Sequence, residues 1–125
     1  GFDVERASER KELAASAKLS RVRRIEPVVK LVQENLGKLP MAVASGGVRM
    51  NVERALDAVG LLPCFSAVVT ASDAVKPKPS PEIFLEAARR LGIRPRLCQV
   101  FEDGDSGIQG ARAAGMVATD VRLFI

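Results

Sequence analysis

The sequence of 125 residues contains no histidine, no tryptophan and no tyrosine. Without histidine, the chain cannot use imidazole as a general acid or base, and it cannot form Ser-His-Asp or Cys-His catalytic groups. Histidine-containing zinc sites are excluded for the same reason. Any catalytic or binding chemistry must therefore come from carboxylates, lysines and arginines, hydroxyls or backbone groups.

Long apolar runs are also missing. No stretch reaches the roughly 20 residues that a membrane-spanning helix needs, and the first residues, GFDVERASERKEL, lack the apolar core of a secretory signal. The only two cysteines, Cys64 and Cys98, lie in apolar surroundings without metal-ligand spacing, which indicates buried free thiols. These features predict a soluble protein of the reducing cytoplasm, with no membrane partner.

The net charge of +4 is modest, and part of the excess lies in KLSRVRR, residues 18–24. We interpret this run as a solvated helix face. Nucleic-acid binding is a weaker alternative, because no aromatic side chains alternate with the basic ones and no groove-reading motif is present.

From residue 26 onward, the sequence alternates between helical and strand patterns. Apolar positions at helical spacing predict four helices, which end at Gly37, Gly60, Gly92 and Gly115. Short apolar runs predict strands at residues 40–45, 66–71, 97–101 and 117–121. Strands that are apolar throughout and separated by single helices indicate a doubly wound, Rossmann-like α/β fold with a parallel sheet covered on both faces. Residues 4–22, by contrast, read as one charged helix packed beside the sheet.

Ligands of open parallel sheets bind at the carboxyl ends of the strands, so the residues that follow each strand are informative. Ser45-Gly46-Gly47 offers a hydroxyl and backbone N–H groups to an anion, or simply a helix cap. Lys76 and Lys78 lie between prolines that could aim one ammonium, although exposed lysines are common in such loops. The acidic loop after the third strand has two interpretations. Either Asp103 and Asp105 are a nucleophile and its acid/base partner, or Glu102 and Asp103 bind a cation such as Mg²⁺.

Three segments resemble a known family. ASGG at 44–47, KPSPEIF at 78–84 and VFEDGDSGIQGARAAGM at 100–116 are similar to the second, third and fourth motifs of haloacid dehalogenase (HAD) superfamily phosphatases. Within this superfamily, the three segments are most similar to the branch that contains β-phosphoglucomutase and sugar-phosphate phosphatases. The resemblance implies a HAD-like α/β core over residues 25–125, with residues 1–24 as a remnant of the helical cap.

The resemblance also implies roles for individual residues. Ser45 would hydrogen-bond the transferring phosphoryl group of a small phosphorylated metabolite, and Lys78, favoured over Lys76, would neutralise its charge. Asp103, with help from Glu102, would bind Mg²⁺. These matches place Asp103 in the metal motif rather than the nucleophile motif, and they leave Asp105 as a solvated loop residue.

One departure from the family is large: the sequence contains no Asp-x-Asp-Gly-Thr nucleophile motif. The chain therefore looks truncated, and we expect negligible turnover from it alone. The alternative is a non-catalytic module that binds phosphate and Mg²⁺ or regulates. In the family, the missing strand lies between the strands that correspond to 40–45 and 97–101. We expect those two strands to pair directly in a closed four-strand sheet, or a homo-oligomer or a strand-donating partner to fill the space, rather than an open gap.

Overall fold

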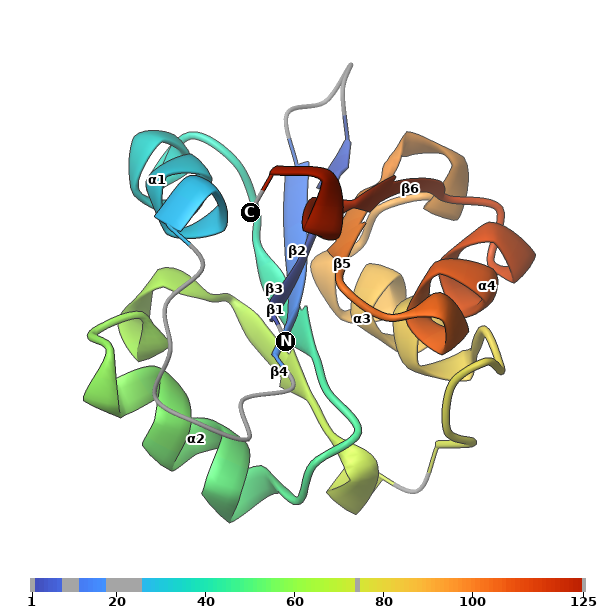
Figure 1. Ribbon diagram of the computed structural model, residues 1–125, viewed down its shortest axis with the longest axis horizontal. Helices are drawn as coiled ribbons and strands as arrows, with labels where there is room; N and C mark the ends of the chain where they lie inside the picture. Colours follow the sequence, from blue (N-terminus) through green and yellow to red (C-terminus); the bar gives the residue numbers. More distant parts are fainter. Residues whose placement is uncertain (1, 8–11, 18–25, 74, 125) are drawn as a thin grey trace.

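The structure is a computed structural model that describes residues 2–7, 12–17, 26–73 and 75–124 (Figure 1). The basic run at residues 18–24 lies outside these residues, so its interpretation as a helix face stays a prediction. No helix in the described part of the chain is long and apolar enough to cross a membrane.

Helices and strands alternate from residue 26 onward, as the sequence predicts. The helices are α1 (Glu26–Asn35), α2 (Arg49–Ala58), α3 (Glu82–Leu91) and α4 (Asp105–Ala113). The strands are β3 (Ala42–Ala44), β4 (Ala67–Val69), β5 (Gln99–Glu102) and β6 (Val117–Asp120). A short 3₁₀ helix, η2 (Ala71–Asp73), follows β4. The predicted end of α3 is confirmed: Gly92 has φ 72°, a left-handed conformation that glycine adopts without strain.

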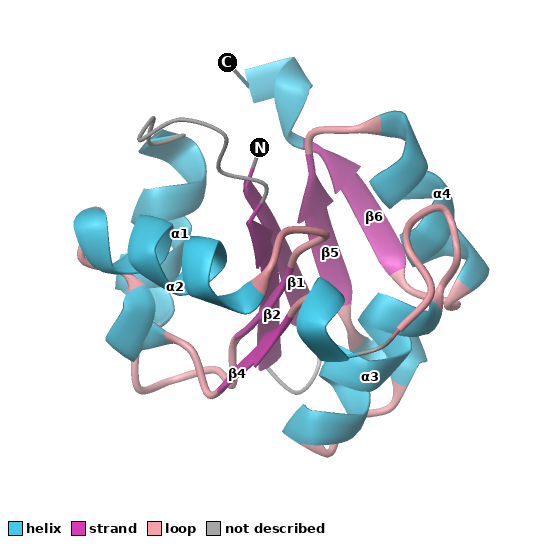
Figure 2. Cartoon of the chain, turned by 90° about the horizontal axis from the view of Figure 1, so that it is seen from below, coloured by secondary structure: helices cyan, strands magenta, loops and turns pink. Residues whose placement is uncertain are grey.

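The parallel pairing predicted for the sheet is confirmed. β3 pairs with β4 and β5 pairs with β6, both in parallel. Helices α1 and α2 cover one face of the strands, and α3 and α4 cover the other (Figures 1 and 2). Each face has its own apolar core. The α1/α2 side includes Val32, Met41, Val43 and Leu56, and the α3/α4 side includes Ile83, Phe84, Val100 and Ala111.

The prediction of one helix over residues 4–22 is wrong for the described part of this segment. Residues Phe2–Ala7 form β1 and residues Glu12–Ala17 form β2, and the two strands pair antiparallel. β1 also pairs antiparallel with β5, at Glu5 opposite Val100. Helix propensity is a weak preference that tertiary pairing overrides, and β5 offers β1 a row of backbone groups on the side that does not face β6.

This hairpin also corrects the expectation for the centre of the sheet. β3 and β5 do not pair directly: the strand order is β2-β1-β5-β6 in one ladder and β3-β4 in the other. β2 lies along β3, so the hairpin occupies the space between β3 and β5 (Figure 1). The prediction of a closed four-strand sheet is therefore wrong. The alternative of an open gap between β3 and β5 does not apply either, because β1 and β2 lie there. The chain fills the space with its own first strands.

Candidate functional site

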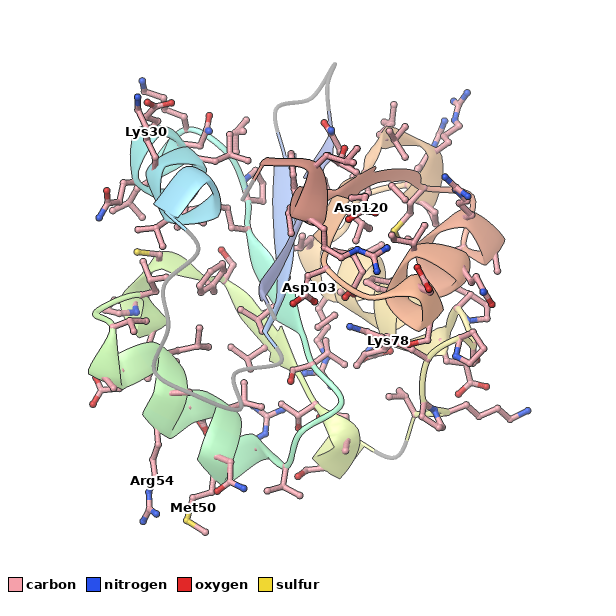
Figure 3. The ribbon with its side chains drawn as sticks, viewed as in Figure 1. Lys30, Met50, Arg54, Lys78, Asp103 and Asp120 are labelled. Carbon is pink, nitrogen blue, oxygen red and sulfur yellow. The ribbon has the colours of Figure 1, made fainter. Side chains whose placement is uncertain are left out.

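Lys78 joins the ends of two strands. Its Nζ atom donates a hydrogen bond to the Glu102 carboxylate at 2.9 Å and to the backbone carbonyl of Ala44 at 3.3 Å. Ala44 directly precedes Ser45, and Glu102 directly precedes Asp103. The lysine thus brings the ends of β3 and β5 together, and Figure 3 shows Lys78 and Asp103 near each other in the middle of the view. The convergence of the three motifs on one edge is what the sequence predicted.

The two lysines of the loop before α3 differ in their exposure and in their contacts. The ammonium of Lys78 lies 5.1 Å from the centre of the Phe84 ring, and the Lys78 side chain is only 12% exposed. Lys76 is exposed, and its backbone N–H donates to the Glu82 carboxylate at 2.8 Å. The geometry therefore places Lys78, and not Lys76, at the strand ends.

Ser45 follows β3 and is buried, with 1% of its surface exposed. Its backbone N–H donates to the carbonyl of Val69 at 2.9 Å, and its hydroxyl accepts from the N–H of Gly47 at 3.2 Å. The residue that caps α2 is Val48, without a side-chain hydrogen bond to the helix. The alternative interpretation of Ser45 as the helix cap is therefore wrong. Its hydroxyl instead belongs to the loop at the edge of the sheet.

Glu102 is 2% exposed and bonded at both carboxylate oxygens. Oε2 faces Lys78, while Oε1 accepts the backbone N–H groups of Asp103 at 3.1 Å and of Gly104 at 3.2 Å. The first turn of α4 packs directly on this side chain: a Cβ atom added at Gly107 would lie 1.9 Å from Cδ of Glu102. Glycine at position 107 is therefore what allows Glu102 to lie beneath α4.

Two adjacent carboxylates, Glu102 and Asp103, are the acidic residues of this edge that could take part in holding a magnesium ion. Among the residues that the structure describes, no group of three or more His, Cys, Asp or Glu side chains could hold a metal ion. Mg²⁺ is commonly bound by one or two carboxylates, with water and substrate phosphate completing its shell. Glu102 would have to exchange one of its present bonds to act as such a ligand.

Asp105 differs in part from its prediction. Its side chain is 80% exposed, as expected for a solvated residue, but it begins α4 rather than lying in a loop. It also pairs with Arg122 at 2.7 Å, and Arg122 pairs with Asp120 at 2.8 Å. Hydrogen bonds from Arg122 lower the pKa of Asp120. Sequence reasoning did not single out Arg122, although its place just after β6 is a signal of the kind used for the other strands.

A second group missed from the sequence lies at the end of β4. The Asp73 carboxylate accepts hydrogen bonds from Arg49 and Arg90, each at 2.8 Å, and from the N–H of Thr70 at 2.7 Å. Burial alone would raise the pKa of Asp73, but the hydrogen bonds from Arg90 and Thr70 and the charge of Arg49 outweigh it and lower the pKa to about 2. Asp73 is therefore ionised throughout the neutral range.

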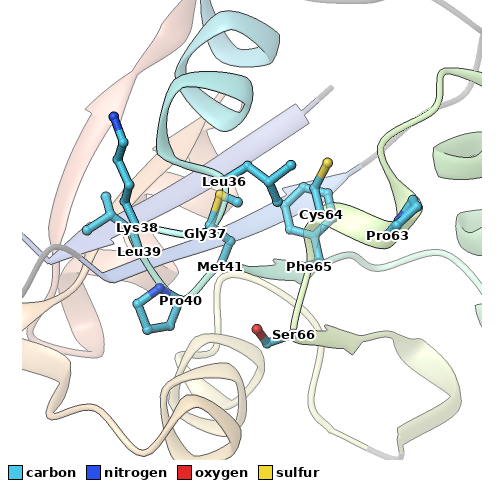
Figure 4. Close-up of a pocket in the computed structure, with 10 residues that line it drawn as sticks. All are labelled: Leu36, Gly37, Lys38, Leu39, Pro40, Met41, Pro63, Cys64, Phe65 and Ser66. Atoms are coloured by element: carbon cyan, nitrogen blue, oxygen red, sulfur yellow. The ribbon is translucent and has the colours of Figure 1, made fainter.

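A cavity of about 390 Å³ lies at the opposite edge of the sheet, before β3 and β4 (Figure 4). Its lining includes Leu36, Met41, Cys64 and Phe65. Cys98 is buried as predicted, but Cys64 is only partly buried, and burial raises the pKa of its thiol. The cavity is thus separate from the strand ends that carry Ser45.

Comparison with known proteins gives a consistent picture. Residues 3–115 match the family described as haloacid dehalogenase-like hydrolases. The sequence is 45% identical over 118 residues to the fructose-1-phosphate phosphatase YqaB of Escherichia coli, an alignment that covers 94% of this chain and 62% of the relative.

Two solved structures are similar in fold. One is a HAD-superfamily hydrolase, subfamily IA, from Geobacter sulfurreducens, with a TM-score of 0.70 and 27% identity over 76% of this chain and 49% of that chain. The other is the β-phosphoglucomutase of Clostridium difficile, with a TM-score of 0.66 and 28% identity over 77% of this chain and 41% of that chain. The chain thus spans less than two thirds of the length of each of these relatives.

Proposed function

Because the chain belongs to the haloacid dehalogenase-like hydrolases, we propose that it has the phosphate site of a Mg²⁺-dependent phosphatase of small phosphorylated metabolites. The observation that carries this proposal is the position of Lys78, whose ammonium bonds to both Ala44 and Glu102. A hydroxyl, an ammonium and a carboxylate at one edge are the groups that hold a phosphoryl group and its cation.

Each residue has a separate role in this proposal. The Ser45 hydroxyl donates a hydrogen bond to a phosphoryl oxygen, and Lys78 neutralises part of the negative charge. Asp103 is the main Mg²⁺ ligand, and Glu102 helps by holding Lys78 and, when it releases a bond, by sharing the ion. When bound, Mg²⁺ supplies further positive charge to the phosphoryl oxygens. Ser45 and Glu102 are both buried, which strengthens these electrostatic interactions.

We expect these 125 residues to bind phosphate but to hydrolyse phosphate esters only slowly. The sequence has no Asp-x-Asp-Gly-Thr motif to supply the attacking carboxylate. The same sequence fact favours the second candidate, a non-catalytic module that binds phosphate and Mg²⁺. Both candidates predict little hydrolysis of p-nitrophenyl phosphate by these residues alone. Hydrolysis with Mg²⁺ separates them once a peptide carrying an Asp-x-Asp-Gly-Thr strand is added, because only the phosphatase fragment should then regain turnover. Turnover that survives in Asp103→Asn without added metal would contradict both, since neither then explains the chemistry.

The phosphate site itself is tested by a matched pair of lysine variants. Affinity for inorganic phosphate in the presence of Mg²⁺ is measured by calorimetry for Lys78→Ala and Lys76→Ala. Loss of a charge-assisted bond should weaken binding about tenfold in Lys78→Ala. Lys76→Ala should bind as the wild type does, because Lys76 is exposed. Equal affinity in the two variants would overturn the assignment, provided that circular dichroism shows both to be folded.

Residues 1–24 are proposed to descend from the helical cap of the family, and residues 25–125 to be its HAD-like α/β core. The family match begins at residue 3, which supports a common origin for this segment despite its strands. We further propose a cytoplasmic location, where the free thiols of Cys64 and Cys98 stay reduced. A homo-oligomer also stays a proposal, which size-exclusion chromatography with light scattering tests directly. A strand-donating partner is no longer needed for the space between β3 and β5, because β1 and β2 lie there.

A further inference from the structure

Asp73 lies at the point where three parts of the fold meet. It is the last residue of η2, directly after β4, and its side chain is 16% exposed. Arg49 reaches it from the first turn of α2, and Arg90 reaches it from the last turn of α3. These helices cover opposite faces of the sheet (Figure 1). One carboxylate therefore ties both helical layers to the end of β4.

The segment that Asp73 holds is bonded to the loop of Ser45. The backbone N–H of Ala71 donates to the carbonyl of Gly47 at 3.0 Å. The N–H of Arg49 donates to the Ser72 hydroxyl at 3.0 Å. Together with the hydrogen bond between the Ser45 N–H and β4, these bonds join residues 45–49 to the end of β4 and η2.

We infer that Asp73 is a positioning residue for the phosphate site: by fixing η2 and Arg49, it holds the Ser45 loop at its distance from Lys78. This inference rests on the proposed function of Ser45 and Lys78. It assigns Asp73 no contact with the phosphate group, because its carboxylate is already bonded to two guanidinium groups and to the Thr70 N–H.

The charge of Asp73 is central to this role. Arg49 and Arg90 both also donate to the carbonyl of Val68, at 2.9 and 3.3 Å, so the two guanidinium groups lie close to each other. Without a carboxylate between them, the two guanidinium groups repel each other. The N–H groups that now donate to Asp73 also lose that negatively charged acceptor. The first turn of α2, with the Ser45 loop before it, is then free to shift.

Glu86 provides a matched control. It too pairs with Arg90, through Oε2 at 2.8 Å, and it also pairs with Arg89. All three residues belong to α3, and neither Glu86 nor Arg89 contacts η2 or the Ser45 loop through any bond that the structure records among the described residues. Glu86→Gln therefore removes a comparable charge while leaving the link to Ser45 in place.

The experiment compares Asp73→Asn and Glu86→Gln by amide hydrogen exchange of the full 125-residue chain. Asp73→Asn should reduce the protection of the Ala71 amide about tenfold, because the bond to Gly47 opens more often. Glu86→Gln should leave that amide unchanged. Unchanged protection of Ala71 in Asp73→Asn would overturn the inference, whether or not phosphate binds.

The second readout is the affinity for inorganic phosphate in the presence of Mg²⁺. Asp73→Asn should weaken it about tenfold, as expected for a residue that orients a binding group, while Glu86→Gln binds normally. A purely structural role would lower the melting temperature of both variants and leave the affinity of the folded protein unchanged, which would overturn the inference. If Asp73→Asn does not fold, Ser72→Ala removes the acceptor of the Arg49 N–H, which is one of the bonds between η2 and residues 45–49. Normal affinity and normal Ala71 protection in that variant would overturn the inference. A wild type that does not bind phosphate refutes the proposed function instead, and the exchange data still decide the role of Asp73.

Discussion

Two groups of ion pairs lie at the carboxyl ends of β5 and β6, and they differ in burial rather than in distance. Lys78 and Glu102 are 2.9 Å apart, with side chains that are 12% and 3% exposed. Arg122 lies 2.7 Å from Asp105 and 2.8 Å from Asp120, but its side chain is 43% exposed. Water and salt screen the second group, whereas the first lies in a medium where an unpaired charge is costly. A short distance alone therefore does not identify the pair that matters.

The largest effect is expected from breaking the buried pair. Glu102→Ala removes the carboxylate that accepts a hydrogen bond from the buried Lys78 ammonium, which should reduce the free energy of unfolding by about 3–5 kcal/mol. Urea denaturation followed by circular dichroism measures this loss. The double variant Glu102→Ala, Lys78→Met should recover part of it, because the buried ammonium is removed together with its carboxylate. A loss below about 1 kcal/mol in the single variant would show that the pair is screened like a surface pair.

A smaller effect is expected from crowding the same pair without removing it. In Gly107→Ala, the new methyl group would overlap Glu102, so α4 or Glu102 must move, at a cost of about 1–3 kcal/mol. Gly104→Ala is the control, since its Cβ would lie 3.6 Å from Oε1 of Glu102, an ordinary contact distance. If the unfolding curves show that Gly107→Ala and Gly104→Ala are equally stable, the close packing of α4 on Glu102 is contradicted.

Acid titration tests pairs of intermediate exposure. Hydrogen bonds from Arg89 and Arg90 lower the pKa of Glu86 to about 2, from an ordinary value of 4.5. Because the folded pKa lies below the unfolded one, these bonds stabilise the fold fully above about pH 4.5 and lose their effect as the pH falls toward 2. The melting temperature of the wild type should therefore fall more steeply over this range than that of Glu86→Gln. Parallel curves would contradict the role of this pair.

The smallest effect is expected at the exposed group. Arg122→Ala removes the partner of Asp105 and Asp120, but all three side chains contact water, so the free energy of unfolding should stay within error of the wild type. The unfolding curves are measured at low and high salt. A clear loss of stability at high salt would show that this group resembles the buried pair more closely than its exposure indicates.

The α/β core was predictable because local signals and tertiary packing agree there. Apolar runs such as residues 40–45 contain β3, and Gly92 ends α3 where the glycine pattern placed it. The hairpin was not predictable, since the pairing of Glu5 with Val100 joins residues far apart in sequence and opposes the local helix pattern.

The candidate site shows the same division. The positions of Ser45, Lys78 and Asp103 after strands, or before a helix on the intervening loop, were enough to predict that the loop of Lys78 meets the ends of β3 and β5. The internal bonds of Glu102 were not, because which oxygen faces Lys78 depends on the close approach of α4 at Gly107. The link from Asp73 to Arg90 was missed for a similar reason, since it joins side chains from elements whose relative rotation the sequence does not reveal.

The two arginines that share the Val68 carbonyl also have a consequence for self-association. β4 pairs with β3 on one side, and on its other side Val68 accepts hydrogen bonds from Arg49 and Arg90. An extended segment of a second molecule that paired with this side of β4 would contact the two guanidinium groups. It would also find the Val68 carbonyl already hydrogen-bonded to them. This margin of the protein is therefore guarded against strand-by-strand aggregation by the same side chains that hold its helices.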